Sequence, residues 1–182
     1  MTASPETQMA TWAIDPSHSQ AEFAVKHMVF TTVKGHFSDI SGMITFDQAN
    51  WSNSKVSVTI PVATVTTSDA KRDAHLQSPD FFDSENNPNI TFNSTKIEKT
   101  GGDGLKITGD LSIRGVSKSV VLDSTFNGQG PTPFGTTIVS FSAATKINRK
   151  DFDVSFNMPL EGGGLMVGEE IKISIELEAI KQ

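Results

Sequence analysis

Apolar and polar residues alternate along most of this chain, and this two-residue period is the feature that most restricts its fold. In GEEIKISIELEAI (168–180), Ile171, Ile173 and Ile175 would face one side of a strand, while Lys172 and Ser174 face the other. Strands with one apolar face are typical of antiparallel sheets that cover a core on one side. The same pattern predicts strands at 18–28, 33–46, 55–63, 89–97, 105–113, 116–126, 136–147 and 168–180.

Turn-forming residues separate these segments, as in TGGDG (100–104) and NGQGPTPFG (127–135). Only residues 69–77 have a helical pattern, with Ser68 or Asp69 as the N-cap and Ser78-Pro79 as the stop signal. A parallel α/β fold needs a helix between most strands, and the chain has no room for them. The sequence therefore predicts an all-β, antiparallel fold of eight strands, for which a barrel and a sandwich both remain open.

The length and net charge of the chain exclude several classes of function. A chain of 182 residues is expected to form one domain, residues 1–182, and a net charge of -6 argues against a nucleic-acid partner. Without cysteine the chain has neither disulfides nor thiolate metal sites. The N-terminus lacks the basic and apolar regions of a leader, and no apolar run is long enough to span a bilayer. The chain as written is expected to be soluble and cytoplasmic, or periplasmic or secreted if a leader was removed.

Histidine and aspartate are the residue types that could make this chain an enzyme. The candidates are His18, His27, His36 and His75, with Asp15, Asp73, Asp80 and Asp83. Ligands on one face of a strand must be an even number of residues apart, but His18, His27 and His36 follow one another at intervals of nine. The chain also lacks the common nucleophile, zinc and phosphate-loop motifs. We therefore expect no metal site and no enzymatic activity.

Seven blocks, in order, resemble the YceI-like family of polyisoprenoid-binding proteins. They are WAIDPSHSQAEFAVKHM (12–28), VKGHFSDISG (33–42), RDAHLQSPDFFD (72–83), PNITFNST (88–95), GDLSIRGVSKSV (109–120), NRKDFDVSFN (148–157) and VGEEIKISIELEA (167–179). One departure is Asp153, where the family usually has Gly. The resemblance implies an extended, lipocalin-like, eight-stranded antiparallel barrel with a core of about residues 12–180. It also implies a bound isoprenoid lipid in place of a cofactor, such as a polyprenyl phosphate or a quinone, which the protein carries or sequesters. Homodimers and transient contact with a membrane are further expectations.

The inward-facing residues of such a barrel would line its ligand cavity, because a hydrocarbon tail offers no hydrogen bonds and needs apolar surroundings. The expected lining residues are Phe23, Val25, His27, Phe37, Ile44, Phe81, Phe82, Ile90, Phe92, Leu111, Ile113, Val120, Leu122, Phe141, Ile173 and Ile175. The alternative is that these side chains pack against one another as a solid core. For His27, two interpretations stay open: a neutral side chain satisfied by a neighbour, or a donor to the ligand.

Residues 69–83, DAKRDAHLQSPDFFD, interrupt the strands with a charged stretch that ends in two phenylalanines. The resemblance implies that this segment covers part of the barrel, with Phe81 and Phe82 turned inward and Lys71, Arg72 and Asp73 in water. Arg72 and His75 are candidates for contact with an anionic head group, because a guanidinium binds phosphate in a bidentate manner. The favoured alternative is an ion pair between Arg72 and a nearby Asp that fixes the segment.

Overall fold

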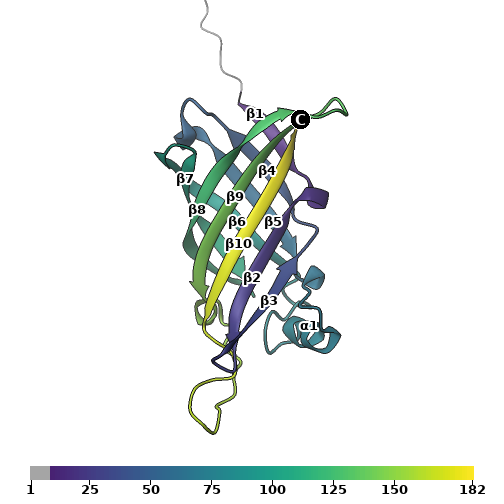
Figure 1. Ribbon diagram of the computed structural model, residues 1–182, viewed down its shortest axis with the longest axis vertical. Coiled ribbons are helices and arrows are strands. Elements are labelled where there is room, and N and C mark those ends of the chain that lie inside the picture. The colour runs from purple at the N-terminus through teal and green to yellow at the C-terminus, as the bar shows by residue number, and fades with distance from the viewer. Residues whose placement is uncertain (1–8) are drawn as a thin grey trace, which may run out of the picture.

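The computed structural model describes residues 9–182, and all ten of its strands belong to one continuous antiparallel sheet (Figure 1). Its strands are β1 (Ala10–Ile14), β2 (Gln20–His27), β3 (Thr31–Phe37), β4 (Ser41–Phe46), β5 (Lys55–Pro61), β6 (Asn89–Gly101), β7 (Gly104–Ile113), β8 (Val116–Pro131), β9 (Thr137–Asn148) and β10 (Glu170–Lys181). The helical elements are α1 (Ala70–Gln77) and four short 3₁₀ turns, η1 (Pro16–His18), η2 (Trp51–Asn53), η3 (Val62–Thr64) and η4 (Arg149–Phe152).

The sheet closes into a barrel. Eight strands follow one another in the order β1-β4-β5-β6-β7-β8-β9-β10, and β1 pairs again with β10. Every pairing is antiparallel, so the predicted all-β antiparallel barrel is confirmed. The two remaining strands, β2 and β3, form a hairpin that continues the wall, because β2 pairs with β10 where β1 has ended.

The number of strands differs from the prediction, because the chain forms ten strands and not eight, and β6 and β8 extend beyond the predicted ends at 97 and 126. The predicted strand 33–46 is broken at residues 38–40, where Asp39 has a left-handed backbone (φ 56). The strand β1 was missed because Pro16 and η1 separate it from β2 in the sequence. Both interruptions lie side by side, since β1 pairs with β4 and β2 pairs with β3.

An aromatic cluster fills the end of the barrel where β1 begins and β10 ends, the upper end in Figure 1. The ring of Phe46 stacks on Trp12 at 5.4 Å and on Trp51 at 5.5 Å, and meets Phe141 edge-on at 5.8 Å. Trp12 is only 2% exposed. Aromatic contacts of this kind add about 0.5–1.5 kcal/mol each to the burial of the rings. The upper end is therefore closed by side chains of the barrel itself.

The lower end carries the helix and the longest connections of the chain (Figure 1). The expected N-cap of α1 is confirmed at Asp69, whose Oδ1 accepts hydrogen bonds from the backbone N–H groups of Lys71 and Arg72, both at 3.0 Å. We call residues 69–83 the lid segment. Opposite it lies loop 153–169, which connects η4 to β10. No helix in residues 9–182 combines the length and the apolar character needed to cross a bilayer.

The turn after η4 forms despite the departure at Asp153. This residue adopts the left-handed conformation (φ 58, ψ 22), and its N–H donates to the carbonyl of Lys150. Aspartate tolerates this region better than most residues that carry a side chain. The aspartate therefore keeps the turn that a glycine would make, at a modest cost in backbone energy.

Candidate functional site

An apolar cavity lies inside the barrel. Its volume is about 230 Å³. Aliphatic and aromatic side chains from almost every strand line it, together with residues of the lid segment and η4. The barrel is therefore hollow, and its interior is not completely filled by side chains.

All of the predicted lining residues except His27 lie on this cavity. His27 is exposed, which corrects its assignment to the apolar interior. Its strand pairs with β10 only from Gln20 to Ala24, and beyond Val25 it pairs with β3 and, through a single bridge from His27 to Val167, with loop 153–169. The alternation thus continues past the point where an interior exists. Ligand binding by the other residues stays a prediction.

Both phenylalanines of the lid segment border the cavity. Phe81 is 8% exposed, and its ring contacts those of His75 at 5.0 Å and Phe156 at 5.2 Å. Phe82 meets the ring of Phe37 on β3 edge-on at 5.7 Å. Phe81 therefore joins the lid segment to loop 153–169, and Phe82 joins it to the barrel wall.

The predicted head-group residues lie elsewhere. Arg72 is exposed and does not border the cavity; it donates to the hydroxyl of Thr67 at 2.7 Å and to its carbonyl at 2.8 Å. The expected ion pair between Arg72 and an Asp is absent from residues 9–182, where Thr67 takes its place. Asp73, expected in water, is half-buried and accepts from the N–H of Thr67 at 2.7 Å. His75, also away from the cavity, pairs with Asp80 at 2.8 Å.

The prediction missed several lining residues, and three of them lie just beyond the last residue of β9. They are Arg149, Phe152 and Val154, which are 4%, 2% and 6% exposed. A signal for Arg149 is present in the sequence, since it continues the odd-numbered inward phase of Phe141 and Ile147. An arginine at the end of such a series was not among the candidates, because arginine is rarely buried.

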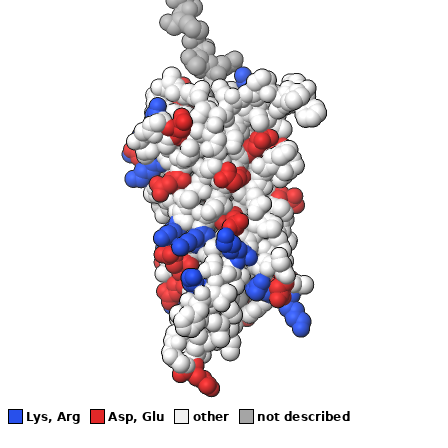
Figure 2. Space-filling view, in the orientation of Figure 1, with Lys and Arg blue, Asp and Glu red and all other residues white. Residues whose placement is uncertain are grey.

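The outer surface carries charge of both signs. Figure 2 shows Lys and Arg next to Asp and Glu around the middle of the displayed face, with no broad basic area on it. Exposed apolar side chains concentrate instead at the lower end. Met28, Val29 and Phe30 occupy the β2–β3 turn, and Met158 and Leu165 lie in loop 153–169. The N–H of Met28 donates to the carbonyl of Met166 at 2.8 Å, which joins the turn to the loop.

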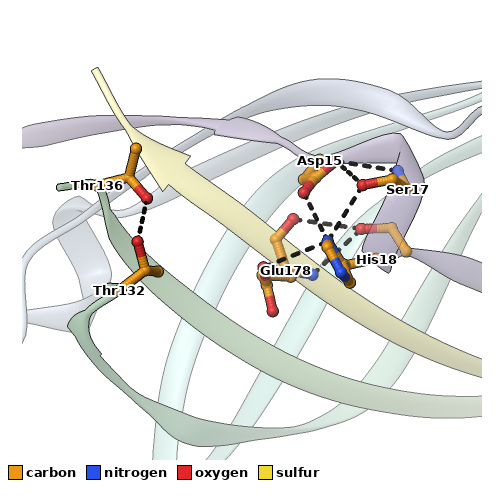
Figure 3. Close-up of polar contacts among 7 residues, drawn as sticks. Asp15, Ser17, His18, Thr132, Thr136 and Glu178 are labelled. Carbon is orange, nitrogen blue, oxygen red and sulfur yellow. Dashed lines mark hydrogen bonds and ion pairs between the residues drawn. The ribbon is translucent and has the colours of Figure 1, made fainter. Parts of the chain in front are cut away.

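A cluster of polar side chains lies on the outside of the barrel at η1 (Figure 3). His18 Nδ1 is 2.8 Å from Asp15 Oδ2, 3.1 Å from Ser17 Oγ and 3.6 Å from Glu178 Oε1. These residue types make up hydrolytic triads, but a triad uses both ring nitrogens, one for the acid and one for the nucleophile. Here both contacts involve Nδ1. Asp15, His18 and Glu178 also offer one ligand atom each within 4.8 Å of one another, the one such group of His, Asp and Glu found in residues 9–182.

The hydrogen bonds and charges of this cluster hold η1 against β10, and we call the cluster the η1 clamp. The bond from His18, followed by that from Ser17, holds the pKa of Asp15 below its usual value of 3.8. The bond to Asp15, followed by the charge of Glu178, raises the pKa of His18 above 6.5. Ser19 adds a link to the same residue of β10, since its hydroxyl donates to the carbonyl of Glu178 at 3.2 Å.

We expect this clamp to make stability depend on pH. The His18 contribution is complete below pH 6.5 and is lost as pH rises through its raised pKa, whereas the Asp15 contribution is complete above pH 3.8 and is lost as pH falls through its lowered pKa. Both are therefore present together between these two values. The Tm of His18→Gln should lie furthest below that of the unchanged protein in this window, and the difference should shrink at pH 8. A difference that is constant with pH would contradict the clamp.

Comparison with known proteins agrees with this architecture. The family model described as YceI-like domain matches residues 12–179. Protein YceI of Escherichia coli is 37% identical over 165 residues, 91% of this chain and 83% of its own. Among solved structures, Burkholderia cenocepacia BcnA has a TM-score of 0.80 at 25% identity, over 91% of this chain and 98% of its own. A domain from Saccharophagus degradans, described as polyisoprenoid binding, shares the fold with a TM-score of 0.67 at 12% identity, over 96% of this chain and 100% of its own. The closed barrel, its lid and the match over residues 12–179 place this chain in the family of YceI-like domain proteins.

Proposed function

We propose that this protein binds a long-chain isoprenoid lipid, or a similar amphiphile, in the barrel cavity and carries or sequesters it. The observation that supports this most directly is the apolar cavity inside the barrel, which the lid segment borders. Family membership and a structural neighbour described as polyisoprenoid binding favour a binding protein over an enzyme. Each CH₂ group of a tail that leaves water for such a cavity gains about 0.8 kcal/mol.

The energetics of the cavity also favour a ligand. The apolar side chains around an empty cavity lack partner atoms on one side, so they lose dispersion contacts that a packed interior would make. A hydrocarbon tail that fills the space recovers much of this loss. We therefore expect the loaded protein to be markedly more stable than the empty one.

We place entry and exit of the ligand at the lower end of the barrel. The aromatic cluster closes the upper end, whereas the lower end is covered by the lid segment and loop 153–169. Most of the exposed large apolar residues lie at this same end, on the β2–β3 turn and loop 153–169. A lipid that leaves here would pass beside apolar surface, in keeping with the expected transient contact with a membrane.

The test is to purify the protein natively, extract it with organic solvent and identify the extract by mass spectrometry. We expect a long-chain lipid in near-stoichiometric amount, absent from an unrelated protein purified in the same way, and a Tm that falls when the lipid is removed. No lipid, and no stabilisation by added prenyl compounds, would favour a structural barrel. Elemental analysis of the same sample tests the alternative of a metal-dependent enzyme. One metal per chain, lost in the double variant Asp15→Asn and His18→Ala, would support that alternative.

A further inference from the structure

Large apolar side chains are exposed to water as a group at the lower end of the barrel. Within residues 9–182, nine large apolar residues are exposed, and five of them lie on the β2–β3 turn and loop 153–169. We call these five the apolar tip: Met28, Val29, Phe30, Met158 and Leu165. The other four lie singly, before β1, on β4, on β8 and in the β8–β9 turn. Single exposed apolar residues are common, whereas a group of them marks a surface that contacts a partner.

The two connections that carry the apolar tip hold each other in place. The N–H of Met28 donates to the carbonyl of Met166 at 2.8 Å. The side chain of Val29 lies over Gly164, where a Cβ atom would be only 2.9 Å from Val29 Cγ2. Two segments that are far apart in the chain thus form one surface before any partner arrives.

The β2–β3 turn presents its apolar side chains at a cost in backbone energy. Met28 and Val29 both have left-handed backbones, with φ of 53 and 69. Asparagine and glycine usually take this conformation, and a β-branched valine is among the residues least suited to it. Strain of this kind persists where the surrounding structure enforces it, and it is concentrated at functional sites. The fold therefore keeps an unfavourable turn that places three large apolar side chains in water.

The apolar tip is continuous with the wall of the cavity. Val25, three residues before Met28, borders the cavity, and so does Val167, which directly follows Met166. Val167 also forms a bridge with His27 at the end of β2. The tip therefore lies at the end of the barrel where we place the entry and exit of the lipid.

The size and position of the apolar tip favour a bilayer over a protein as its partner. A stable protein interface uses roughly 20–30 residues on each side, and five side chains on two loops fall far short of this. Insertion into a bilayer needs no surface of matching shape, because lipid tails adapt to each apolar side chain. Loop 153–169 also extends beyond the lower end of the barrel wall, so it can reach a flat surface before the strands do (Figure 1).

The charges next to the apolar tip favour a neutral bilayer. The single charged residue in 154–168 is Glu161, which is negative. On the other side of the tip, the nearest lysines in sequence are Lys26 in β2 and Lys34 in β3, and Lys34 is paired with Glu22 at 3.7 Å. These segments have no excess of positive charge to attract anionic lipids, so contact with a bilayer has to come from apolar insertion.

We propose that the apolar tip inserts into the surface of a neutral phospholipid bilayer and holds the lower end of the barrel against it. This inference rests on the proposed function and adds the partner with which the protein exchanges its lipid. A lipid tail would then pass between bilayer and cavity along apolar side chains, without the cost of exposing its CH₂ groups to water. Phe30 is the expected anchor, because it is 88% exposed, more than any other residue of the tip.

The first experiment uses two single-cysteine variants, since the chain itself has no cysteine. Phe30→Cys lies in the tip, and Phe134→Cys, the matched control, replaces a residue that is 91% exposed in the β8–β9 turn. Each is labelled with nitrobenzoxadiazole, a fluorophore that brightens in apolar surroundings, and mixed with phosphatidylcholine vesicles. The label at residue 30 should brighten at least about twofold as it leaves water, and spin labels within the bilayer should quench it. The label at residue 134 should not respond.

The second experiment measures the contribution of the ring itself with unlabelled protein. Binding to phosphatidylcholine vesicles should weaken at least about fivefold in Phe30→Ser, because the variant inserts less apolar area. Phe134→Ser, which loses an equally exposed ring elsewhere, should bind like the unchanged protein. Because the contact is apolar, binding should persist in about 0.5 M salt. It should also not increase when a third of the lipid is replaced by anionic phosphatidylglycerol.

Several outcomes would overturn this inference and leave the lipid-binding function standing. They are a label at residue 30 that does not respond, equal responses of the two labels, and binding that requires anionic lipid and is lost in salt. A dimer in sedimentation velocity that dissociates in Phe30→Ser would instead assign the tip to a second copy of the chain. Solvent extraction of the native protein tests the lipid-binding function separately. Docking on vesicles by a protein that yields no lipid would refute that function and leave the docking surface in place.

Discussion

Replacing Ile173 by Glu is expected to abolish lipid binding and to destabilise the protein by about 3–5 kcal/mol, the range found for uncompensated buried charges. Ile173 is the fourth residue of β10, pairs with Thr145 on β9 and Phe23 on β2, and borders the cavity. A carboxylate there would lose hydration and find no positively charged partner among these neighbours. Chemical denaturation and lipid extraction of the purified variant measure the two effects.

The pH dependence of this variant gives a second measurement. Burial should raise the pKa of the new carboxyl above its unfolded value of about 4.3. The folded protein then tolerates the group in its neutral form below that value and loses stability as the pH rises above it. We therefore expect Ile173→Glu to be closer to the unchanged protein at pH 4 than at pH 7.

Val121→Glu is the matched control, because it makes the same apolar-to-acidic change on an outward-facing residue that is 40% exposed. This variant should keep its stability within about 0.5 kcal/mol, as surface substitutions usually do. If Ile173→Glu behaved like this control, with unchanged lipid content, the inward assignment of β10 would be wrong.

Replacing Phe81 and Phe82 together by Ala is expected to speed ligand release at least tenfold, with the barrel strands intact. The two rings form the inner face of the lid segment, and a covering segment controls exit without building the sheet. A tenfold change in the rate corresponds to about 1.4 kcal/mol, a small part of what two buried phenylalanines contribute. Stopped-flow release of a fluorescent prenyl analogue measures the rate, and circular dichroism reports on the strands.

The two single variants distinguish an effect on ligand release from an effect on the stability of the protein. Phe81 is packed against His75 and Phe156, so Phe81→Ala should cost about 3 kcal/mol of stability as well as loosening the lid. Phe82 is less buried and contacts Phe37, so Phe82→Ala should act mainly on release. If the double variant unfolds, Phe82→Ala alone carries the test.

Phe134→Ala is the control for the lid. This phenylalanine is 91% exposed in the turn between β8 and β9, away from the lid segment, and its loss should change neither stability nor release. Release rates for the Phe81 and Phe82 variants that equal those of Phe134→Ala would show that residues 69–83 do not act as a lid.

The sequence by itself determined the features that depend on near neighbours in the chain. The two-residue period of β10 identified Ile173 and Ile175 as members of one apolar face, and both border the cavity. The helix was found from its cap and stop signals, because Asp69 bonds to residues two and three positions away. Side-chain alternation and capping are local, so a single sequence contains them in full.

Only the tertiary structure decided what lies opposite each face. Alternation assigned His27 to the apolar side, but β2 there runs past its pairing with β10 and has no interior to face. Arg72 was expected beside an aspartate and instead bonds to Thr67. Arg149 is buried because closure of the barrel brings η4 against loop 153–169, whose carbonyls receive its donors. The two-residue period of a strand identifies the residues that share one face. The residues that contact this face belong to strands and loops distant in the chain, and these meet only when the barrel closes.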